Sequence, residues 1–541
     1  MSAPASATES VSHRQIDHDV VIIGAGFAGM YQLHRLRGLG LNCRVFETGS
    51  GIGGTWYWNR YPGARCDVES IHYSYSFDKD LEQEWTWPER YSAQPDILEY
   101  AEHVADRFEL RRDITFNTRV TALDYDDHAN RWTVTTDTGE QVTAQFVITA
   151  VGCLSTSQTP HFEGVETFTG QTYHTGHWPH EPVDLSGKRV GVIGTGSSGI
   201  QTITAIAPIV GDLTVFQRTA NFSVPSRNRP LTPSEITAVK DQYPQIRDLN
   251  RQSKIGYIAK GTGKPTTEFS DLEIEKILQQ RWDEGGQLTG AFTDLLVSAE
   301  ANEIAAEFAR SRIRDLVNDP ETADLLCPTT HPIGTKRLCV DTGYFQVYNR
   351  DNVHLIDINA APIERIAPQG IVAGGELHEL DVIIFATGFD AMTGPLNGIA
   401  ITAGGQSLKE KWHAGPRTYL GLMSHGFPNL FMITGPGSPS VLTNMIISIE
   451  QHVDAIADAI VHIRERDLAR IEPILQAEDE WVDSVNEAAA GSLMVRANSW
   501  YMGANVPGKP RIFMPYIGGA GAYRQTCDQV VADGYAGFAM S

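Results

Sequence analysis

Two glycine-rich loops in one chain constrain its fold more than any other feature. Each has the form Gly-X-Gly-X-X-Gly and follows a short β-branched run: residues 24–29 come after 19–23, and residues 194–199 come after 189–193. Such a loop lets a pyrophosphate approach the backbone at a helix start, where free N–H groups attract negative charge. One loop is weak evidence, but two imply two dinucleotides. We therefore predict an α/β fold with two Rossmann-like dinucleotide-binding domains.

The first loop has every part of a dinucleotide unit in register. Gly24 permits the tight turn, Gly26 lets the pyrophosphate approach, and Gly29 lets the helix pack close to the strand. A second strand at 43–46 ends at Glu47, whose carboxylate can accept hydrogen bonds from both ribose hydroxyls. The alternative is a surface glutamate that closes a strand. We assign this loop to the flavin nucleotide.

The second loop lacks the acid. Gln217 stands where the first unit has its glutamate, and Arg218 and Thr219 follow directly. A carboxylate would repel a 2′-phosphate, whereas a guanidinium can bind one with two hydrogen bonds. The pattern favours NADPH over NADH, and the alternative for Arg218 is a solvated surface arginine. The loop residues assigned to this cofactor are Gly194, Thr195, Gly196, Ser197, Ser198 and Gly199.

Composition excludes several other classes of protein. A chain of 541 residues is too long for one ordinary core, and its net charge of -23 argues against nucleic acid and anionic membranes as partners. No apolar run reaches the length of a bilayer span. The six cysteines show neither the paired spacing of a flavin disulfide reductase nor that of a zinc site. We expect reduced thiols, a cytoplasmic protein and no metal.

The order of these segments predicts two split domains. After a flexible tail at 1–18, the FAD-binding domain takes 19–152 and 389–541, and the NADP-binding domain takes 153–224 and 331–388. A helical insertion at 225–330 interrupts the second domain. It contains capping boxes at 232–235 and 270–273. An apolar stripe follows the second box and is expected to pack in the core of the insertion: Ile274, Ile277, Leu278 and Trp282.

Two longer signatures give the chain a family resemblance. The first is Phe-X-Gly-X-X-X-His-X-X-X-Trp-Pro, at Phe168, Gly170, His174, Trp178 and Pro179. The second combines Gly-Gly-X-Trp with Tyr-Pro-Gly-X-X-X-Asp, at Gly53, Gly54, Trp56, Tyr61, Pro62, Gly63 and Asp67. The chain after residue 18 resembles the type I Baeyer–Villiger monooxygenases, most of all the group of phenylacetone and steroid monooxygenases. His174 could serve as a general base, but orienting the backbone is the better interpretation.

The resemblance implies a reaction and the residues that carry it. Members of this family use FAD and NADPH to insert one oxygen atom from O2 next to a ketone carbonyl. A flavin 4a-peroxide gives an ester or lactone. Arg337 matches the residue that stabilises the peroxide anion and its adduct, and its permanent charge suits that role. Asp67 matches the carboxylate that orients it, and Lys336 is a second candidate for the 2′-phosphate.

The same resemblance assigns further positions. Trp500 matches a mobile-loop tryptophan near bound NADP, although it could equally be a hydrophobic anchor. A loop beside the flavin is expected to line the substrate pocket, with ordinary loop burial as the alternative: Ser440, Val441, Leu442 and Met445. The other cofactor-binding positions are Phe27, Thr55, Trp56, Trp58, Asp67, Tyr73, Val120, Gln201, Arg337 and Met445.

Alternatives to ketone oxygenation stay open at this point. A protonated peroxide could instead oxygenate sulfur or nitrogen, and a non-oxygenating NADPH-binding redox protein would carry the same two loops. The expected partners are a small-molecule ketone and O2, with no obligatory protein partner. Fold kinship does not carry substrate choice, so linear, aryl, cyclic and steroid ketones are all compatible with the sequence.

Overall fold

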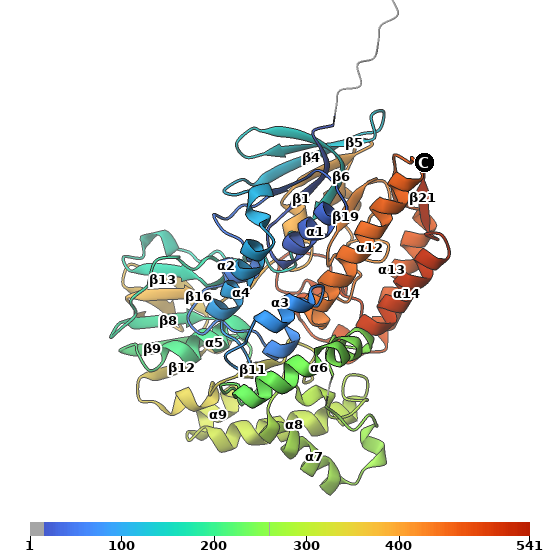
Figure 1. Cartoon of the computed structure of the whole chain (residues 1–541). Coiled ribbons are helices and arrows are strands. Elements are labelled where there is room, and N and C mark those ends of the chain that lie inside the picture. Colours follow the sequence, from blue (N-terminus) through green and yellow to red (C-terminus); the bar gives the residue numbers. More distant parts are fainter. Residues whose placement is uncertain (1–15, 259) are drawn as a thin grey trace, which may run out of the picture.

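A computed structural model describes residues 16–258 and 260–541, so most of the predicted N-terminal tail lies outside the described residues. Figure 1 shows three groups of elements: one large sheet with helices, a second smaller sheet, and a cluster of helices below both. No helix in the described part of the chain is long and apolar enough to cross a membrane.

The first sheet contains the strands on both sides of the first glycine loop and strands from residues 400–432. Its order is β18-β17-β4-β5-β6-β1-β2-β3, and β19 pairs with β6 in parallel. The strands are β1 His18–Ile23, β2 Cys43–Phe46, β3 Ile114–Thr115, β4 Val120–Asp126, β5 Arg131–Thr136, β6 Gln141–Thr149, β17 Ala400–Ala403, β18 Gln406–Ser407 and β19 Leu430–Met432. Helices α1 (Phe27–Gly38) and α12 (Met445–Glu465) pack together in the core on one side of this sheet.

The second sheet is fully parallel, with the order β12-β9-β8-β16-β7. Its strands are β7 Gln171–His174, β8 Arg189–Ile193, β9 Asp212–Gln217, β12 Val353–Asp357 and β16 Val382–Phe385. The central strands are β-branched and buried on both faces, as a parallel sheet between helices requires. Helix α5 (Ser197–Ile206) follows β8 directly. Beside it lies the three-stranded sheet of β13 Ile363–Ala367, β14 Gly370–Ala373 and β15 Glu376–Glu379.

The predicted insertion is helical. Its helices are α6 Pro233–Gln252, α7 Asp271–Glu284, α8 Ala299–Leu316 and α9 Pro320–Leu326. Thr232 and Glu235 form the predicted capping box of α6. Ile274, Leu278 and Trp282 are buried in one cluster with residues of α8, and Ile277 packs against it. The stripe on α7 is therefore core packing.

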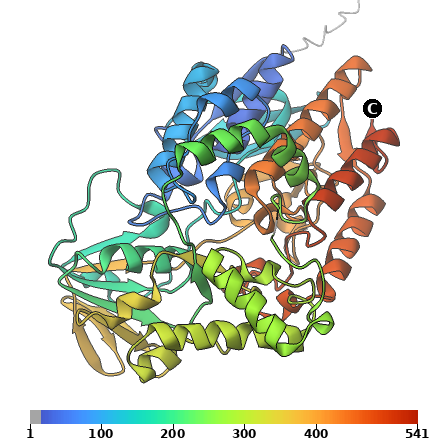
Figure 2. The same ribbon diagram turned by 60° about the horizontal axis from the view of Figure 1, so that its bottom comes forward.

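The remaining elements connect and cover these parts. Figure 2, turned so that the base comes forward, shows α6 lying against the blue N-terminal segment, apart from the yellow-green helices α7 and α8. These elements are α2 Thr55–Trp58, α3 Lys79–Glu84, α4 Gln94–Arg107, α10 Gly394–Asn397, α11 Leu408–Lys411, α13 Leu475–Ala490, α14 Ala520–Ala532, β10 Ser223–Pro225, β11 Cys339–Asp341, β20 Ile471–Pro473 and β21 Phe538–Met540.

Strands predicted around both glycine loops agree closely with the structure. Strand β4 begins at Val120. Asn117 has φ of 53°, a left-handed conformation that interrupts a strand. The predicted domain boundaries remain a prediction. The strands of the first sheet fall within 18–149 and 400–432, and those of the second within 171–217 and 353–385.

Candidate active site

The first glycine loop is closely packed where the helix starts. A Cβ on Gly29 would lie 1.8 Å from the carbonyl oxygen of Gly24, and a Cβ on Gly26 would lie 3.3 Å from Cα of Gly54. Helix α1 has no side-chain cap and no acidic residue in its first turn. Its first N–H groups therefore remain available, and the loop fits a pyrophosphate.

Glu47 lies at the end of β2, buried beside this loop. One of its oxygens accepts a hydrogen bond of 2.7 Å from the N–H of Ala25, and the other accepts one of 2.7 Å from the N–H of Gly49. Burial raises the pKa of the carboxyl group, against the effect of these N–H groups. Because each carboxylate oxygen can accept more than one hydrogen bond, Glu47 can still bind ribose hydroxyls.

The second loop is open where the first is covered. A Cβ on Gly199 would lie 2.2 Å from the carbonyl oxygen of Gly194, the same close contact as in the first unit. Around a Cβ on Gly196, however, there is no heavy atom of the described residues within 4 Å. The Thr195 hydroxyl donates to the carbonyl oxygen of Thr219 at 2.9 Å, which ties the loop to the end of β9. Ser197 contacts the Cys339 thiol at 3.1 Å.

Two cations lie beside this second loop without a carboxylate. The charge of exposed Arg218 adds to burial in lowering the pKa of Lys336. Among the described residues, neither side chain forms an ion pair. The Gln217 side-chain amide donates to the carbonyl oxygen of Leu325 at 2.7 Å. Two unneutralised cations suit a doubly charged phosphate, so the residues present fit NADPH.

Arg337 and Asp67 form a two-pronged ion pair between segments 270 residues apart. Nε donates to Oδ2 at 2.7 Å and Nη2 donates to Oδ1 at 2.6 Å. Nη1 donates to the carbonyl oxygen of Val441 at 2.9 Å. Burial opposes the charged form of Arg337, but Asp67 outweighs burial and raises the pKa of the guanidinium well above its ordinary value. The contact with Asp67 thus holds the guanidinium of Arg337 charged and in one position.

Apolar side chains gather next to this charge. Val441 is buried in a cluster against which Leu442, Met445 and Trp500 pack. Ser440, the first residue of the same turn, is fully buried in a left-handed conformation with φ of 41°. The structure thus brings the predicted pocket residues and Trp500 together beside Arg337.

The segment that leads to Asp67 rests on the second glycine unit. The Tyr61 hydroxyl donates to the side-chain oxygen of Gln201 at 2.8 Å, and the Gln201 amide donates to the carbonyl oxygen of Arg65 at 3.0 Å. A Cβ on Gly63, whose φ is 81°, would lie 2.5 Å from the carbonyl oxygen of Gln201. Gln201, predicted at a cofactor, joins α5 to this segment.

The other predicted cofactor positions lie in several places. The Trp56 indole donates to the Tyr73 hydroxyl at 3.1 Å, and Phe27 packs against Tyr73 with ring centroids 6.1 Å apart. Trp58 packs edge-on against His177 at 6.1 Å. Thr55 is exposed at the start of α2, and Val120 is buried in β4. Of these, Trp56, Tyr73 and Phe27 share one wall beside the first loop.

His174 holds backbone in place. Its Nδ1 accepts from the N–H of Gly176 at 2.9 Å, and its Nε2 lies 3.2 Å from the Thr387 hydroxyl. Burial lowers the pKa of the ring, which favours the neutral form. These contacts join the first signature, which contains His174, to residues 386–388 after β16. They agree with an orienting role for His174.

Sequence analysis did not identify two tyrosines that lie near the ion pair. Both Arg337 and Asp67 act electrostatically on the hydroxyls of Tyr257 and Tyr501, and burial raises the pKa of each. Tyr257 follows α6 in the predicted insertion, far from either signature. Tyr501 adjoins Trp500, and that adjacency was the only signal available for either residue.

Comparisons with known proteins agree with this site. Residues 21–275 match the family model described as pyridine nucleotide-disulphide oxidoreductase. A Baeyer-Villiger monooxygenase of Pseudooceanicola batsensis is 44% identical over 98% of this chain and 97% of its own length. Phenazine N-monooxygenase PhzNO1 of Lysobacter antibioticus is 40% identical over 96% of this chain and 97% of its own length. A solved structure of oxidized steroid monooxygenase bound to NADP is 51% identical and has a TM-score of 0.93. The match covers 97% of this chain and 99% of the chain in that structure.

Proposed function

The chain belongs to the Baeyer–Villiger monooxygenases, which use FAD and NADPH to insert one oxygen atom from O2 next to a ketone carbonyl. We propose that Arg337 stabilises the negative charge of this step and that Asp67 positions Arg337. The observation that carries the proposal is the half-buried, two-pronged contact between them, at 2.6 and 2.7 Å, beside an apolar wall. Bound FAD, reduced by NADPH, supplies the electrons and the position at which O2 is activated.

The protein's part in this reaction is to hold positive charge where negative charge develops on oxygen. Arg337 has five N–H donors, and two go to Asp67 and one to the carbonyl oxygen of Val441. The remaining donors are on the terminal nitrogens, where the guanidinium also forms a hydrogen bond with the Tyr501 hydroxyl, and they are held in a fixed orientation. A charge fixed before the reaction needs no reorganisation during it, which is the usual source of large catalytic effects.

Asp67 has a positioning role in this scheme. An arginine with 25% of its side chain exposed would otherwise sample many rotamers, and the paired carboxylate restricts it to one. Asp67 also offsets the cost of burying the charge. Its own place depends on Tyr61 and Gly63, which rest on α5.

The first test is Arg337→Ala. Flavin reduction by NADPH is expected to continue, while ester formation falls by about 10²–10³-fold or more, the usual effect of removing a preformed charge-stabilising donor. Stopped-flow absorbance gives the reduction rate and gas chromatography gives the ester. Arg189→Ala, which removes a surface ion pair with Asp381, is the control and is expected to keep both activities. Undiminished ester formation by Arg337→Ala would refute the role.

For the pyridine nucleotide, Arg218 and Lys336 are proposed to bind the 2′-phosphate. Support comes from their proximity and from the lack of a carboxylate partner among the described residues. The remaining predicted contacts of the second loop, Thr195, Ser197 and Ser198, lie at the start of α5, which has no side-chain cap.

The apolar character of the pocket wall favours apolar ketones. Val441, Leu442, Met445 and Trp500 offer no charged group, so the carbonyl oxygen of the substrate is proposed to face Arg337. Incubation with NADPH, labelled O2 and a panel of linear, aryl, cyclic and steroid ketones identifies the preferred class. An ester or lactone carrying one labelled oxygen is the expected product.

Nitrogen oxygenation is the second candidate, because a relative of 40% identity is named a phenazine N-monooxygenase. Adding phenazines and sulfides to the same panel distinguishes the two: N-oxides without any ester would favour the second candidate.

A cytoplasmic location is also proposed, since all six cysteines are free and five of them are buried. Fractionation of cells that produce the protein tests it.

A further inference from the structure

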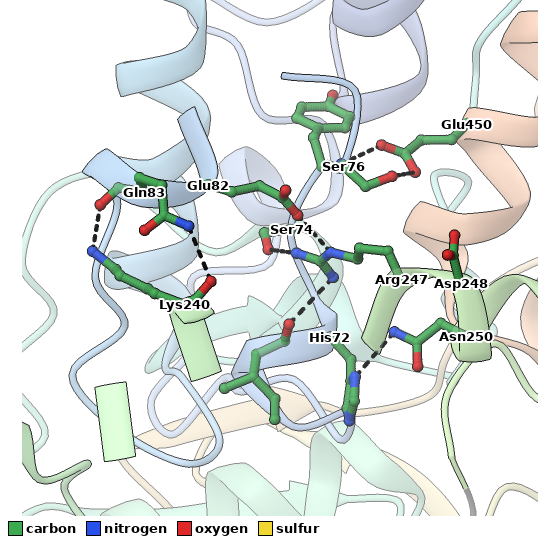
Figure 3. A network of polar contacts seen from close by, with 12 residues as sticks. His72, Ser74, Ser76, Glu82, Gln83, Lys240, Arg247, Asp248, Asn250 and Glu450 are labelled. Atoms are coloured by element: carbon green, nitrogen blue, oxygen red, sulfur yellow. Dashed lines mark hydrogen bonds and ion pairs between the residues drawn. The ribbon is translucent and has the colours of Figure 1, made fainter. Parts of the chain in front are cut away.

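Helix α6 follows the second glycine unit in sequence but is attached to the first in space. Figure 3 shows Lys240, Arg247 and Asn250 of this helix directed at residues 72–83, which precede or belong to α3. At its N-terminal half, Lys240 donates to the hydroxyl of Thr86 at 3.0 Å, and the Gln83 amide donates to the carbonyl oxygen of Lys240 at 3.0 Å. At its other end, Arg251 donates to Ser76 at 3.0 Å. Polar contacts thus run along the length of α6.

The central contact is an ion pair buried between the two segments. The side chains of Arg247 and Glu82 are 3% and 7% exposed and meet at 2.7 Å. Arg247 also donates to the Ser74 hydroxyl at 2.7 Å and to the carbonyl oxygen of Ile71 at 3.2 Å. Breaking a buried pair leaves an uncompensated charge, so this contact fixes α6 against residues 71–82.

Asn250, one helical turn further on, extends these contacts toward the active site. Its amide donates to Nδ1 of His72 at 3.1 Å. Burial lowers the pKa of His72 to about 4, so the ring is neutral and can accept at that nitrogen. The carbonyl oxygen of His72 in turn accepts from the side-chain amide of Asn444 at 2.6 Å. Asn250, His72 and Asn444 are all buried.

Asn444 connects these contacts to the pocket wall. Its side-chain oxygen caps α12 by accepting from the N–H of Ile446 at 3.1 Å, and Met445 is the first residue of that helix. The N–H of Asn444 donates to the carbonyl oxygen of Ile255 at 2.8 Å. The segment after α6 therefore closes onto the same residue that α6 reaches through His72.

From these contacts we propose that Asn250 and His72 are positioning residues for oxygenation: they hold Asn444, and with it the start of α12 and Met445, at the substrate side of Arg337. Neither side chain contacts a reacting group in this scheme. The inference rests on the proposed pocket, in which the ketone lies between Arg337 and Met445. Ketone binding should therefore depend on a helix that the sequence order assigns to the NADP-binding half.

The test is Asn250→Ala in the full-length holoenzyme. Loss of the hydrogen bond is expected to raise the KM for the ketone and the release of hydrogen peroxide by about three- to tenfold, the usual net effect of one such bond. Flavin reduction by NADPH is expected to stay within about twofold of the unaltered protein, because among the described residues no hydrogen bond joins Asn250 to the nucleotide loops. A change that only destabilised the protein would alter the ketone KM and the rate of flavin reduction together.

A second variant, Asn444→Ser, separates capping from positioning. Serine still caps a helix but cannot donate to the carbonyl oxygen of His72 in the same geometry. It is expected to reproduce the KM effect, and the double variant with Asn250→Ala is expected to be no worse than the stronger single change, because both break one chain of contacts. If Asn250→Ala does not fold, Asn444→Ser is the test by itself.

Lys240→Met is the matched control, since it loosens the same helix far from Asn444. It is expected to lower the melting temperature slightly and leave the ketone KM unchanged. An unchanged KM in Asn250→Ala, or an equal rise in Lys240→Met, would overturn the positioning role. Those results would not touch Arg337, whose role fails only if Arg337→Ala still forms ester.

Discussion

The two glycine units share a backbone plan but differ in how much protein covers the ligand. In the first, Gly26 lies under Gly54, and buried Glu47 binds two backbone N–H groups of the loop. In the second, Gly196 faces open space, and the corresponding Gln217 has turned toward α9. The first unit is built around a buried carboxylate and the second around two cations, exposed Arg218 and half-buried Lys336.

This difference matches two uses of a dinucleotide. An enclosed site with a buried acid that organises the loop suits a cofactor that stays bound through many turnovers. An open loop with solvent-accessible charge suits a nucleotide that must enter and leave in each cycle. Charge steers association strongly when it is exposed, so the second unit is also arranged for fast binding.

The largest expected difference is between Glu47→Ala and Gln217→Ala, in FAD content and in melting temperature. Removing Glu47 leaves two buried N–H groups without an acceptor, at about 1–3 kcal/mol each, and removes the predicted contact with the ribose. We expect a colourless protein with a clearly lower melting temperature. Gln217→Ala loses one bond to Leu325, about 1 kcal/mol, and should keep its FAD. Absorbance at the flavin band and calorimetry measure both, and equal FAD loss would break the comparison.

Arg218→Ala tests the cationic half. We expect the KM for NADPH to rise by about 10–100-fold, since a charge-assisted hydrogen bond to the 2′-phosphate is worth roughly 1.5–3 kcal/mol. The KM for NADH should hardly change. Lys336→Ala is expected to act in the same direction. A similar loss for both nucleotides would instead place these side chains at the pyrophosphate.

Gly196→Ala tests the open space in the second loop. No described atom lies within 4 Å of the added Cβ, so folding and FAD content should be unaffected. The methyl group would occupy the space reserved for the pyrophosphate, and we expect NADPH to bind about tenfold more weakly. The matched Gly26→Ala meets Gly54 at 3.3 Å and is expected to lower FAD content. Unaltered NADPH affinity in Gly196→Ala would contradict this placement.

The smallest effect is a pH dependence of NADPH binding. Burial and Arg218 lower the pKa of Lys336 in the free protein, whereas a bound phosphate dianion would favour its charged form. Binding then requires protonated Lys336, so the KM for NADPH should rise as pH increases through this lowered pKa and level off at low pH. Lys336→Arg, which stays charged, is expected to remove the rise. The NADH KM serves as the internal control.

Sequence reasoning was strongest where the chemistry is local. Strand, glycine loop, helix, strand and acid lie within one stretch of chain, so β1, α1, β2 and Glu47 followed from pattern alone. The same holds for the second loop up to Arg218. The pairing of Arg337 with Asp67 was inferred from family resemblance, because no local pattern connects residues 270 positions apart.

What the sequence missed depends on tertiary packing. The capping box placed α6 correctly but carried no information about its neighbours, and the helix packs on residues 71–86 instead of only on its own insertion. Tyr257 and Tyr501 reach Arg337 from two different segments, and each looks like an ordinary apolar position in the chain. The open face of Gly196 is likewise a property of the packing, since both loops have the same spacing.

The pairing of β19 with β6 has a consequence for how the chain folds during synthesis. Strands β1 and β6 emerge early from the ribosome, but their sheet gains β17 only after residue 403 and β19 only after residue 432 has been made. The parallel sheet of the second unit, which starts later, is already complete at residue 385. Since domains fold as units, we expect the middle of the chain to fold before its beginning. The FAD-binding half is then the last part to complete its fold.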